Sequence, residues 1–205
     1  MVKRRSHMGS LGMLLLGIII TISGYLVWHE FFGFGAQRIG DYQTEKPITP
    51  NSLAEILDGD FTAHGVIYDY RGRVISRFNA EIHGEFKGNS GELRESFSYA
   101  SGATDKRRWS IQISDDGSNF SAVADDVEGV AIGKLGGDAI QMSYSLKLPE
   151  RAGGHVLKVN DWLYVMPDGT IVNRSEMRKF GIKAAELFAV FTRKQSSKSA
   201  QIAAE

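Results

Sequence analysis

Two charged side chains lie on otherwise apolar faces of neighbouring predicted strands. In the segment 91–99, Glu95 occupies the same set of every-second positions as apolar residues. In the segment 106–114, Arg107 shares such a set with Trp109 and two isoleucines. Depending on where the connecting turn is centred, Glu95 and Arg107 lie directly opposite one another or as diagonal neighbours on one face. Because an unpaired buried charge is costly, we expect them to pair. Such a pair either fixes the strand register or anchors the polar end of a ligand.

Asp161 shows the same pattern, because the residues two positions before and after it, on the same face of the predicted strand, are apolar. If the turn that follows has a two-residue loop, Asp161 faces Arg174. With a three-residue loop, Asp161 shares a face with Asn173, and Arg174 shares the opposite face with Trp162. The sequence leaves both registers open.

Two further carboxylates are adjacent in the predicted strand 118–130. Asp125 and Asp126 therefore point to opposite faces, and they cannot form an acid/base couple on one wall. We expect one of the two to face the interior.

Other chemistry has little support in the sequence. There is no cysteine, and none of the five histidines pairs with another at the spacing of a metal site. The run GNSG at 88–91 only resembles a nucleophile elbow, and Gly133-Lys134 lacks the earlier glycine and the hydroxyl residue of a phosphate loop. We therefore expect no metal and no cofactor, and the residues favour no enzyme class. Lys and Arg together equal Asp and Glu at 24 each, so no basic excess indicates nucleic-acid binding.

The elements that must position these residues are strands. Eight segments alternate with a period of two and are separated by glycine-containing turns. They span residues 61–69, 73–83, 91–99, 106–114, 118–130, 138–148, 155–165 and 171–174. The segment 181–193 has helical propensity, but it also alternates, and we assign it as a ninth strand. The glycines between 129 and 137 are interpreted as a strand bend and a turn.

Strands at this regular spacing predict an all-β, antiparallel up-and-down barrel of about eight to nine strands. A barrel of this size has room for side chains or for one small ligand.

The N-terminal region predicts a membrane anchor. Lys3, Arg4 and Arg5 precede the uncharged run Leu11–Trp28, which spans roughly 27 Å as a helix, close to the thickness of a hydrocarbon core. Its exit is bulky and unlike a small-residue cleavage site, so we expect an uncleaved single transmembrane helix. The leading basic residues place the N-terminus in the cytoplasm and the C-terminal domain on the periplasmic side of the inner membrane.

The domain boundaries follow from these assignments. Residues 1–32 form the anchor, 33–50 a linker, 51–193 the barrel domain and 194–205 a disordered tail.

Several motifs resemble those of a bacterial family called domain of unknown function 3833. Its opening motif is similar to Leu93-x-Glu95-x-Phe97-x-Tyr99 with Arg107-x-Trp109, and similarity continues through ADDVEG at 124–129 and GGDA at 136–139. It is strongest at Asn160-Asp161-Trp162-Leu163-Tyr164 and Asn173-Arg174-x-x-Met177-x-Lys179-Phe180-Gly181, and it covers about residues 53–193.

This resemblance implies a lipocalin-like fold with no established activity. Family members typically carry a lipidated cysteine, which this chain lacks, so the hydrophobic span takes the place of the lipid. The motif positions imply a ligand-binding or internal polar network, with no residue assigned as catalytic. Its members are Glu95, Arg107, Trp109, Asp126, Asp161, Trp162, Asn173, Arg174 and Lys179.

We hypothesise that the protein is a membrane-anchored periplasmic barrel that binds or handles an apolar ligand such as a fatty acid or lipid. One alternative is a barrel with a filled core that serves as an interaction module for a membrane protein. Another is an enzyme acting on an apolar substrate, in which Glu95 or Asp161 is the acid/base and Arg174 stabilises an anion.

Overall fold

The computed structural model describes residues 8–31, 33–42, 48, 50–115 and 118–194 of the chain. The chain divides into two compact units, Met1–Arg38 and Ile39–Glu205. The division falls inside the predicted linker 33–50, while the predicted tail lies almost wholly outside the described residues.

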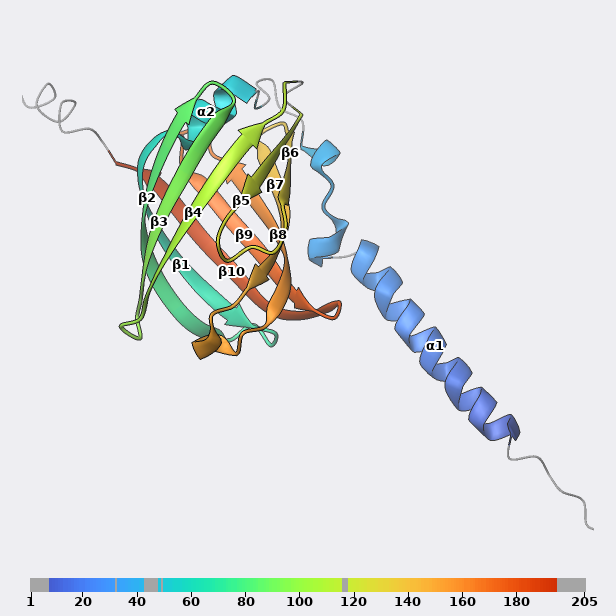
Figure 1. Cartoon of the computed structure of the whole chain (residues 1–205). Helices are drawn as coiled ribbons and strands as arrows, with labels where there is room; N and C mark the ends of the chain where they lie inside the picture. Colours follow the sequence, from blue (N-terminus) through green and yellow to red (C-terminus); the bar gives the residue numbers. More distant parts are fainter. Residues whose placement is uncertain (1–7, 32, 43–47, 49, 116–117, 195–205) are drawn as a thin grey trace, which may run out of the picture. The chain divides into compact units, whose positions relative to one another are not determined.

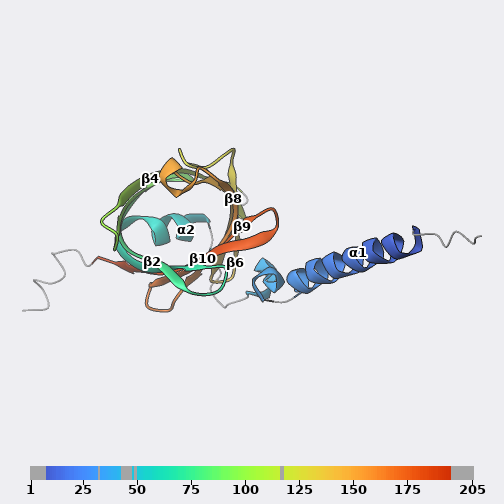
Figure 2. The same ribbon diagram turned by 90° about the horizontal axis from the view of Figure 1, so that it is seen from below.

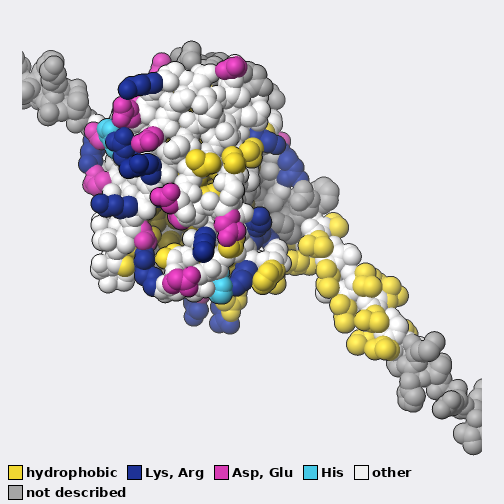
Figure 3. All heavy atoms as spheres, viewed as in Figure 1, with side chains coloured by type: hydrophobic (Ala, Val, Ile, Leu, Met, Phe, Trp, Pro, Cys, Tyr) yellow, Lys and Arg dark blue, Asp and Glu magenta, His cyan; other side chains and the backbone are white. Residues whose placement is uncertain are grey.

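The first unit contains helix α1 (Met8–Phe31) and the short 3-10 helix η1 (Gly33–Ala36). Within α1, the run Leu11–Trp28 is long and apolar enough to cross a membrane, which agrees with the span expected from the sequence. Hydrophobic side chains cover α1 on the face seen in Figure 3, whereas Lys, Arg, Asp and Glu side chains are interspersed over the visible face of the barrel. Length and composition alone are equally compatible with a signal sequence.

The second unit is a closed barrel of ten antiparallel strands with short helices (Figure 1). In chain order its elements are η2 (Ile39–Asp41), α2 (Pro50–Leu57), β1 (Gly59–Asp69), β2 (Val74–Lys87), β3 (Ser90–Tyr99), β4 (Thr104–Ile113), β5 (Asn119–Val123), β6 (Ala131–Gly136), β7 (Ala139–Lys147), η3 (Glu150–Ala152), β8 (Val156–Val165), β9 (Ile171–Lys179) and β10 (Ile182–Arg193). Each strand pairs with its neighbours in sequence, and β10 pairs with β1 to close the sheet. The predicted all-β up-and-down barrel is confirmed, as is the ninth assigned strand, which is β10.

The number of strands is a correction, because the predicted strand 118–130 is interrupted and a tenth strand follows it. β5 ends at Val123, the chain turns, and β6 occupies the glycine-rich stretch that we interpreted as a bend. Gly133 lies opposite Phe120, and a Cβ at this glycine would come within 2.0 Å of the phenylalanine ring. Glycine is thus required here because the ring of Phe120 packs against the strand.

Helix α2 closes one end of the barrel. Viewed along the barrel axis in Figure 2, the strands form a ring and α2 lies across it. Leu53 and Leu57 of this helix are buried, and Gly84 of β2 permits the close approach, since a Cβ there would lie 1.8 Å from the Leu57 carbonyl oxygen. Arg193, at the end of β10, donates hydrogen bonds to the carbonyl oxygens of Glu55 and Ile56 at 3.0 and 2.9 Å. A cation at this position satisfies the free carbonyls at the C-terminus of the helix.

Candidate functional site

A cavity of about 370 Å³ lies inside the barrel. Side chains from every strand except β6 line it, together with Leu57 of α2. Most of the lining is apolar, and Phe78, Met142 and Tyr144, which a filled core would pack, are part of the wall. The barrel is therefore hollow, which argues against the filled-core alternative.

Arg107 is the centre of a polar cluster on this wall. Of the two registers that the sequence allows for this hairpin, the structure shows the one in which Glu95 of β3 lies directly opposite Arg107 of β4. However, the closest partner of Arg107 is Asp126, which its Nε and Nη2 approach to 2.9 and 2.7 Å. The distance from Arg107 Nη1 to Glu95 Oε2 is 3.9 Å, and this oxygen is buried without a hydrogen-bond partner. Glu95 and Arg107 thus lie within ion-pair distance, as expected, but the shorter ion pair of Arg107 is with Asp126, which the sequence did not predict.

Asp126 reaches the interior from a loop. It lies in the turn between β5 and β6, so the prediction that Asp125 and Asp126 belong to one continuous strand is wrong. One of the two does face the interior, as expected, and it is Asp126.

A second polar group surrounds Asp161 of β8. Its Oδ2 accepts a hydrogen bond of 2.8 Å from the Tyr144 hydroxyl, and its Oδ1 accepts from Asn173 Nδ2 at 3.3 Å and from the Ser175 hydroxyl. Asp161 lies directly opposite Ser175, and Arg174 lies opposite Trp162. Of the two registers left open by the sequence, the structure therefore has the one in which Asp161 shares a face with Asn173.

Burial dominates the electrostatics of this site. It raises the pKa of Glu95, an effect that Arg107 opposes and the neighbouring carboxylates Asp161 and Asp126 reinforce. Burial also raises the pKa of Asp161, although the hydrogen bonds from Ser175, Tyr144 and Asn173 act in the opposite direction. The pKa of Tyr144 is raised by burial and by the adjacent Asp161. The cluster thus holds carboxyl groups that favour the protonated state more than exposed carboxyls do.

Aromatic rings complete this wall of the cavity. Trp109 and Tyr144 pack edge to face with their centroids 5.3 Å apart. The guanidinium of Arg107 lies 5.6 Å from the Trp109 ring centroid and 5.9 Å from that of Phe97. Both distances are within the range of a favourable cation–π contact, so the two rings help to hold the guanidinium in place.

The structure brings together six of the nine predicted site residues on the cavity wall. These are Glu95, Arg107, Trp109, Asp126, Asp161 and Asn173. The other three, Trp162, Arg174 and Lys179, are not part of this lining.

Trp162 faces outward but is still only 2% exposed. Tyr42, which follows η2, covers its ring with centroids 5.3 Å apart, and Tyr164 stacks beside it at 6.3 Å. The buried tryptophan thus fixes the segment after η2 to the outside of the barrel.

Arg174 and Lys179 also lie away from the cavity. Arg174 Nε is 2.7 Å from Glu186 Oε1, a contact between β9 and β10 on the face opposite to the cavity. Arg174 cannot stabilise an anion in the interior, which removes one part of the enzyme hypothesis. Lys179 ends β9, with its Nζ 5.5 Å from the ring centroid of Phe180 in the adjoining turn.

Ser175 was missed as a member of the site. The predicted strand ended at Arg174, whereas β9 continues to Lys179. Had the alternation Ile171, Asn173, Ser175 been followed further, the serine would have been placed beside Asp161. Among the described residues, no group of three or more His, Asp or Glu side chains is arranged to hold a metal ion.

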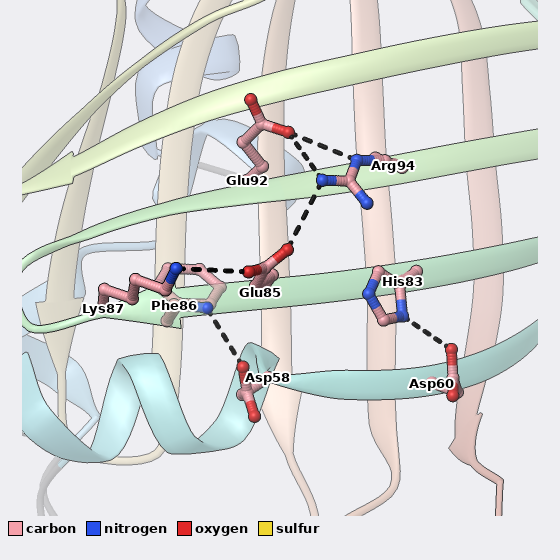
Figure 4. A network of polar contacts seen from close by, with 8 residues as sticks. All are labelled: Asp58, Asp60, His83, Glu85, Phe86, Lys87, Glu92 and Arg94. Atoms are coloured by element: carbon pink, nitrogen blue, oxygen red, sulfur yellow. Dashed lines mark hydrogen bonds and ion pairs between the residues drawn. The ribbon is translucent and has the colours of Figure 1, made fainter.

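Charges of the same types occupy the outer face of strands β2 and β3 (Figure 4). Arg94 Nη2 lies 3.1 Å from Glu92 Oε2 and 3.5 Å from Glu85 Oε2. The side chains of Arg94, Glu85 and Glu92 are 47%, 51% and 39% exposed, so water shares these contacts.

Comparisons with known proteins support the fold and one family. A family model described as "Protein of unknown function (DUF3833)" matches residues 29–193. No curated protein matches the chain in sequence.

Two solved structures are similar to the barrel. The S-type phycobiliprotein lyase CPES from Guillardia theta superposes with a TM-score of 0.53 at 7% identity, over 73% of this chain and 95% of the lyase. Rv2717c from M. tuberculosis superposes with a TM-score of 0.52 at 14% identity, over 73% of this chain and all of that one. At these identities, the similarity shows the fold alone.

Proposed function

The chain belongs to this DUF3833 family, and we propose that it is a membrane-anchored barrel that binds an apolar small molecule or lipid in its cavity. The observation that carries the proposal is a hollow, mainly apolar interior of about 370 Å³ whose wall holds a few polar groups, gathered around Arg107 and Asp161. Ligand sites are typically cavities of about 300–1,000 Å³ with few, well-placed polar groups. The apolar wall supplies affinity, and the cluster around Arg107 and Asp161 orients the polar end of the ligand.

The anchor supports a site of action at a membrane. Helix α1 contains an 18-residue apolar run, and Lys3, Arg4 and Arg5 precede it in the sequence. By the positive-inside rule, this order favours a cytoplasmic N-terminus and a barrel on the periplasmic side of the inner membrane. An anchored barrel in that position meets apolar molecules as they leave the bilayer.

The ligand proposal is tested by filling the cavity. Ala122 of β5 is 2% exposed and lines the cavity, whereas its neighbour Val123 is 45% exposed and is not part of the lining. We expect Ala122→Phe to abolish most binding of the apolar fluorophore N-phenyl-1-naphthylamine by the full-length protein in amphipol, because the new ring occupies the cavity. Val123→Phe is the matched control and retains binding.

Native mass spectrometry of the full-length protein extracted from membranes is a second test for a bound ligand. A bound apolar species, displaced by added fluorophore, supports the proposal. A protein that is uniformly free of ligand and does not bind the fluorophore contradicts it.

The membrane topology is tested separately. A C-terminal fusion to alkaline phosphatase is expected to be active, since this enzyme requires the periplasm, and the intact mass of the extracted protein should include residues 1–32. An inactive fusion contradicts the orientation, and a mass lacking these residues contradicts the uncleaved anchor.

A further inference from the structure

The charged groups inside the cavity are unequal in number. Glu95, Asp126 and Asp161 line its inner wall, and among the described lining residues Arg107 is the cation that faces them. Two lysines, Lys106 and Lys147, also border the cavity, but both are exposed. The inner wall therefore offers more carboxyl groups than cations to an incoming ligand.

We propose that the cavity selects apolar molecules whose polar end donates a hydrogen bond, a hydroxyl or an amine, and excludes those that end in a carboxylate. This inference rests on the proposed function and adds the chemical class of the ligand. It departs from the expectation drawn from the sequence, because a fatty acid ends in a carboxylate and is excluded, whereas lipids that end in a hydroxyl or an amine remain.

The first argument concerns Arg107, the group that would have to bind a carboxylate. Its Nε and Nη2 are engaged by Asp126, and its remaining Nη1 faces Glu95 Oε2 at 3.9 Å. An anionic ligand would have to displace a carboxylate that is already held by two nitrogens. Bidentate pairs of this kind are the strong ones, so this exchange gains nothing.

The second argument concerns the neutral donors. The neutral donors around Asp161 are the Tyr144 and Ser175 hydroxyls and Asn173 Nδ2, and all three already point at its carboxyl group. Asn173 Nδ2 also donates to the Trp162 carbonyl oxygen at 3.2 Å. A ligand carboxylate would find these hydrogens committed and the charge of Asp161 beside it.

The third argument is an acceptor without a donor. Glu95 Oε2 is buried and has no hydrogen-bond partner among the described residues. An unsatisfied buried acceptor is costly, and a hydroxyl or ammonium group of a ligand would satisfy it. The groups that face Glu95 are Arg107 and Trp109 from β4, Asp126 from the β5–β6 turn, Tyr144 from β7 and Asp161 from β8. Two of these groups are carboxyls and the one cation is already paired with Asp126, so a donor suits this position and an anion does not.

The test compares three probes with one ring system and three polar ends. 2-Naphthylmethanol, 2-naphthylmethylamine and 2-naphthoate compete with N-phenyl-1-naphthylamine for the full-length protein in amphipol at pH 7. We expect the alcohol and the amine each to displace the fluorophore at concentrations at least about tenfold lower than the carboxylate, a factor that corresponds to about 1.4 kcal/mol. The comparison between the alcohol and the amine distinguishes a hydroxyl ligand from a cationic one.

Two variants on β3 assign the effect to Glu95. In Glu95→Gln, the amine should lose about tenfold in affinity while the alcohol changes little, because the amide still accepts a hydrogen bond but carries no charge. Glu92→Gln, on the outer face of the same strand, should leave all three affinities unchanged. If Glu95→Gln does not fold, the ranking of the three probes on the unaltered protein remains the test.

The outcomes separate the two proposals. If the carboxylate competes as well as the alcohol or better, the selection is overturned, but the proposed binding of apolar molecules stands. If neither the fluorophore nor any of the three probes binds, the proposed function itself fails.

Discussion

Strand β3 carries Arg94 on the outer face of the barrel and Glu95 on the inner face, and these adjacent residues belong to two very different networks. On the outer face, the Arg94 side chain contacts the carboxylates of Glu85 and Glu92. The three side chains are 47%, 51% and 39% exposed, respectively. Inside, the Glu95 side chain is 11% exposed, and the Arg107 side chain facing it is 20% exposed. The chemical types are the same, and the difference is the access of water.

This comparison shows why the inner network is the functional candidate. Water screens and solvates the outer ion pairs, so each contributes about 0–1 kcal/mol to stability. The inner charges have lost their hydration, and they depend on one another and on any ligand that enters. Contacts with the inner network can therefore contribute to the binding free energy of a ligand. The outer charges are already solvated by water and have less to gain from a ligand.

The largest effect is expected from removing the inner cation. Arg107→Leu leaves Glu95 and Asp126 without their counter-ion and should lower the free energy of unfolding by about 3–5 kcal/mol. Adding Glu95→Leu should recover a large part of this loss, because Glu95 is the more deeply buried of these two carboxylates, with a side chain 11% exposed against 35% for Asp126. Urea unfolding of the full-length protein in amphipol, followed by tryptophan fluorescence, measures the cycle. Strictly additive effects would mean that Glu95 and Arg107 do not interact.

The second largest loss of stability is expected from removing the hydrogen bond between Tyr144 and Asp161. Tyr144→Phe removes a buried donor from a buried carboxyl and should cost about 1–3 kcal/mol in the same unfolding measurement. The control is Tyr164→Phe, since the Tyr164 hydroxyl lies 3.4 Å from that of Tyr42 on the outer face. We expect this control to cost less. An equal or larger cost for Tyr164→Phe would show that the inner hydrogen bond has no special importance.

The raised pKa of Glu95 predicts a pH-dependent difference. A carboxyl whose pKa is higher in the folded than in the unfolded protein binds more protons in the native state, so its contribution to stability falls as the pH rises above about 4.5. The slope is at most about 1.4 kcal/mol per pH unit for one group. Glu95→Gln removes this loss, and the variant should gain stability relative to the unaltered protein as the pH rises from 4.5 toward neutrality. Parallel stability curves for the two proteins would contradict burial as the cause.

The smallest effect belongs to the outer network. Arg94→Ala should change the free energy of unfolding by less than about 1 kcal/mol, and salt should reduce even that change. A loss similar to that of Arg107→Leu would mean that exposure does not distinguish the two networks.

The sequence predicted the fold and the inner face of the site, because both follow from alternation. A period of two assigns Glu95, Arg107 and Asp161 to apolar faces, and the closure of the sheet then turns these faces inward. Alternation does not predict where a strand stops. Asp126 was therefore assigned to a continuous strand instead of a turn, and the principal ion pair with Arg107 was missed.

Two other differences between the predicted and the observed structure also arise because alternation along a strand carries no information about turns or distant contacts. The register after β8 depends on the turn geometry, and only the structure shows that Asp161 faces Ser175 and not Arg174. Trp162 is buried because Tyr42, about 120 residues away in the sequence, covers it from outside. A strand pattern identifies the face of a residue but not the segment that packs against that face.

The central claim is that a ligand enters the barrel and contacts the inner network. The most direct measurement uses the indole N–H signals of Trp109 and Trp162 in a ¹⁵N-resolved NMR spectrum of the full-length protein. Trp109 lines the cavity, and Trp162 is buried on the outside of it. Titration with N-phenyl-1-naphthylamine should shift the Trp109 signal and leave that of Trp162 in place. A shift of Trp162 alone, or of neither signal at saturating fluorophore, would contradict binding in the cavity.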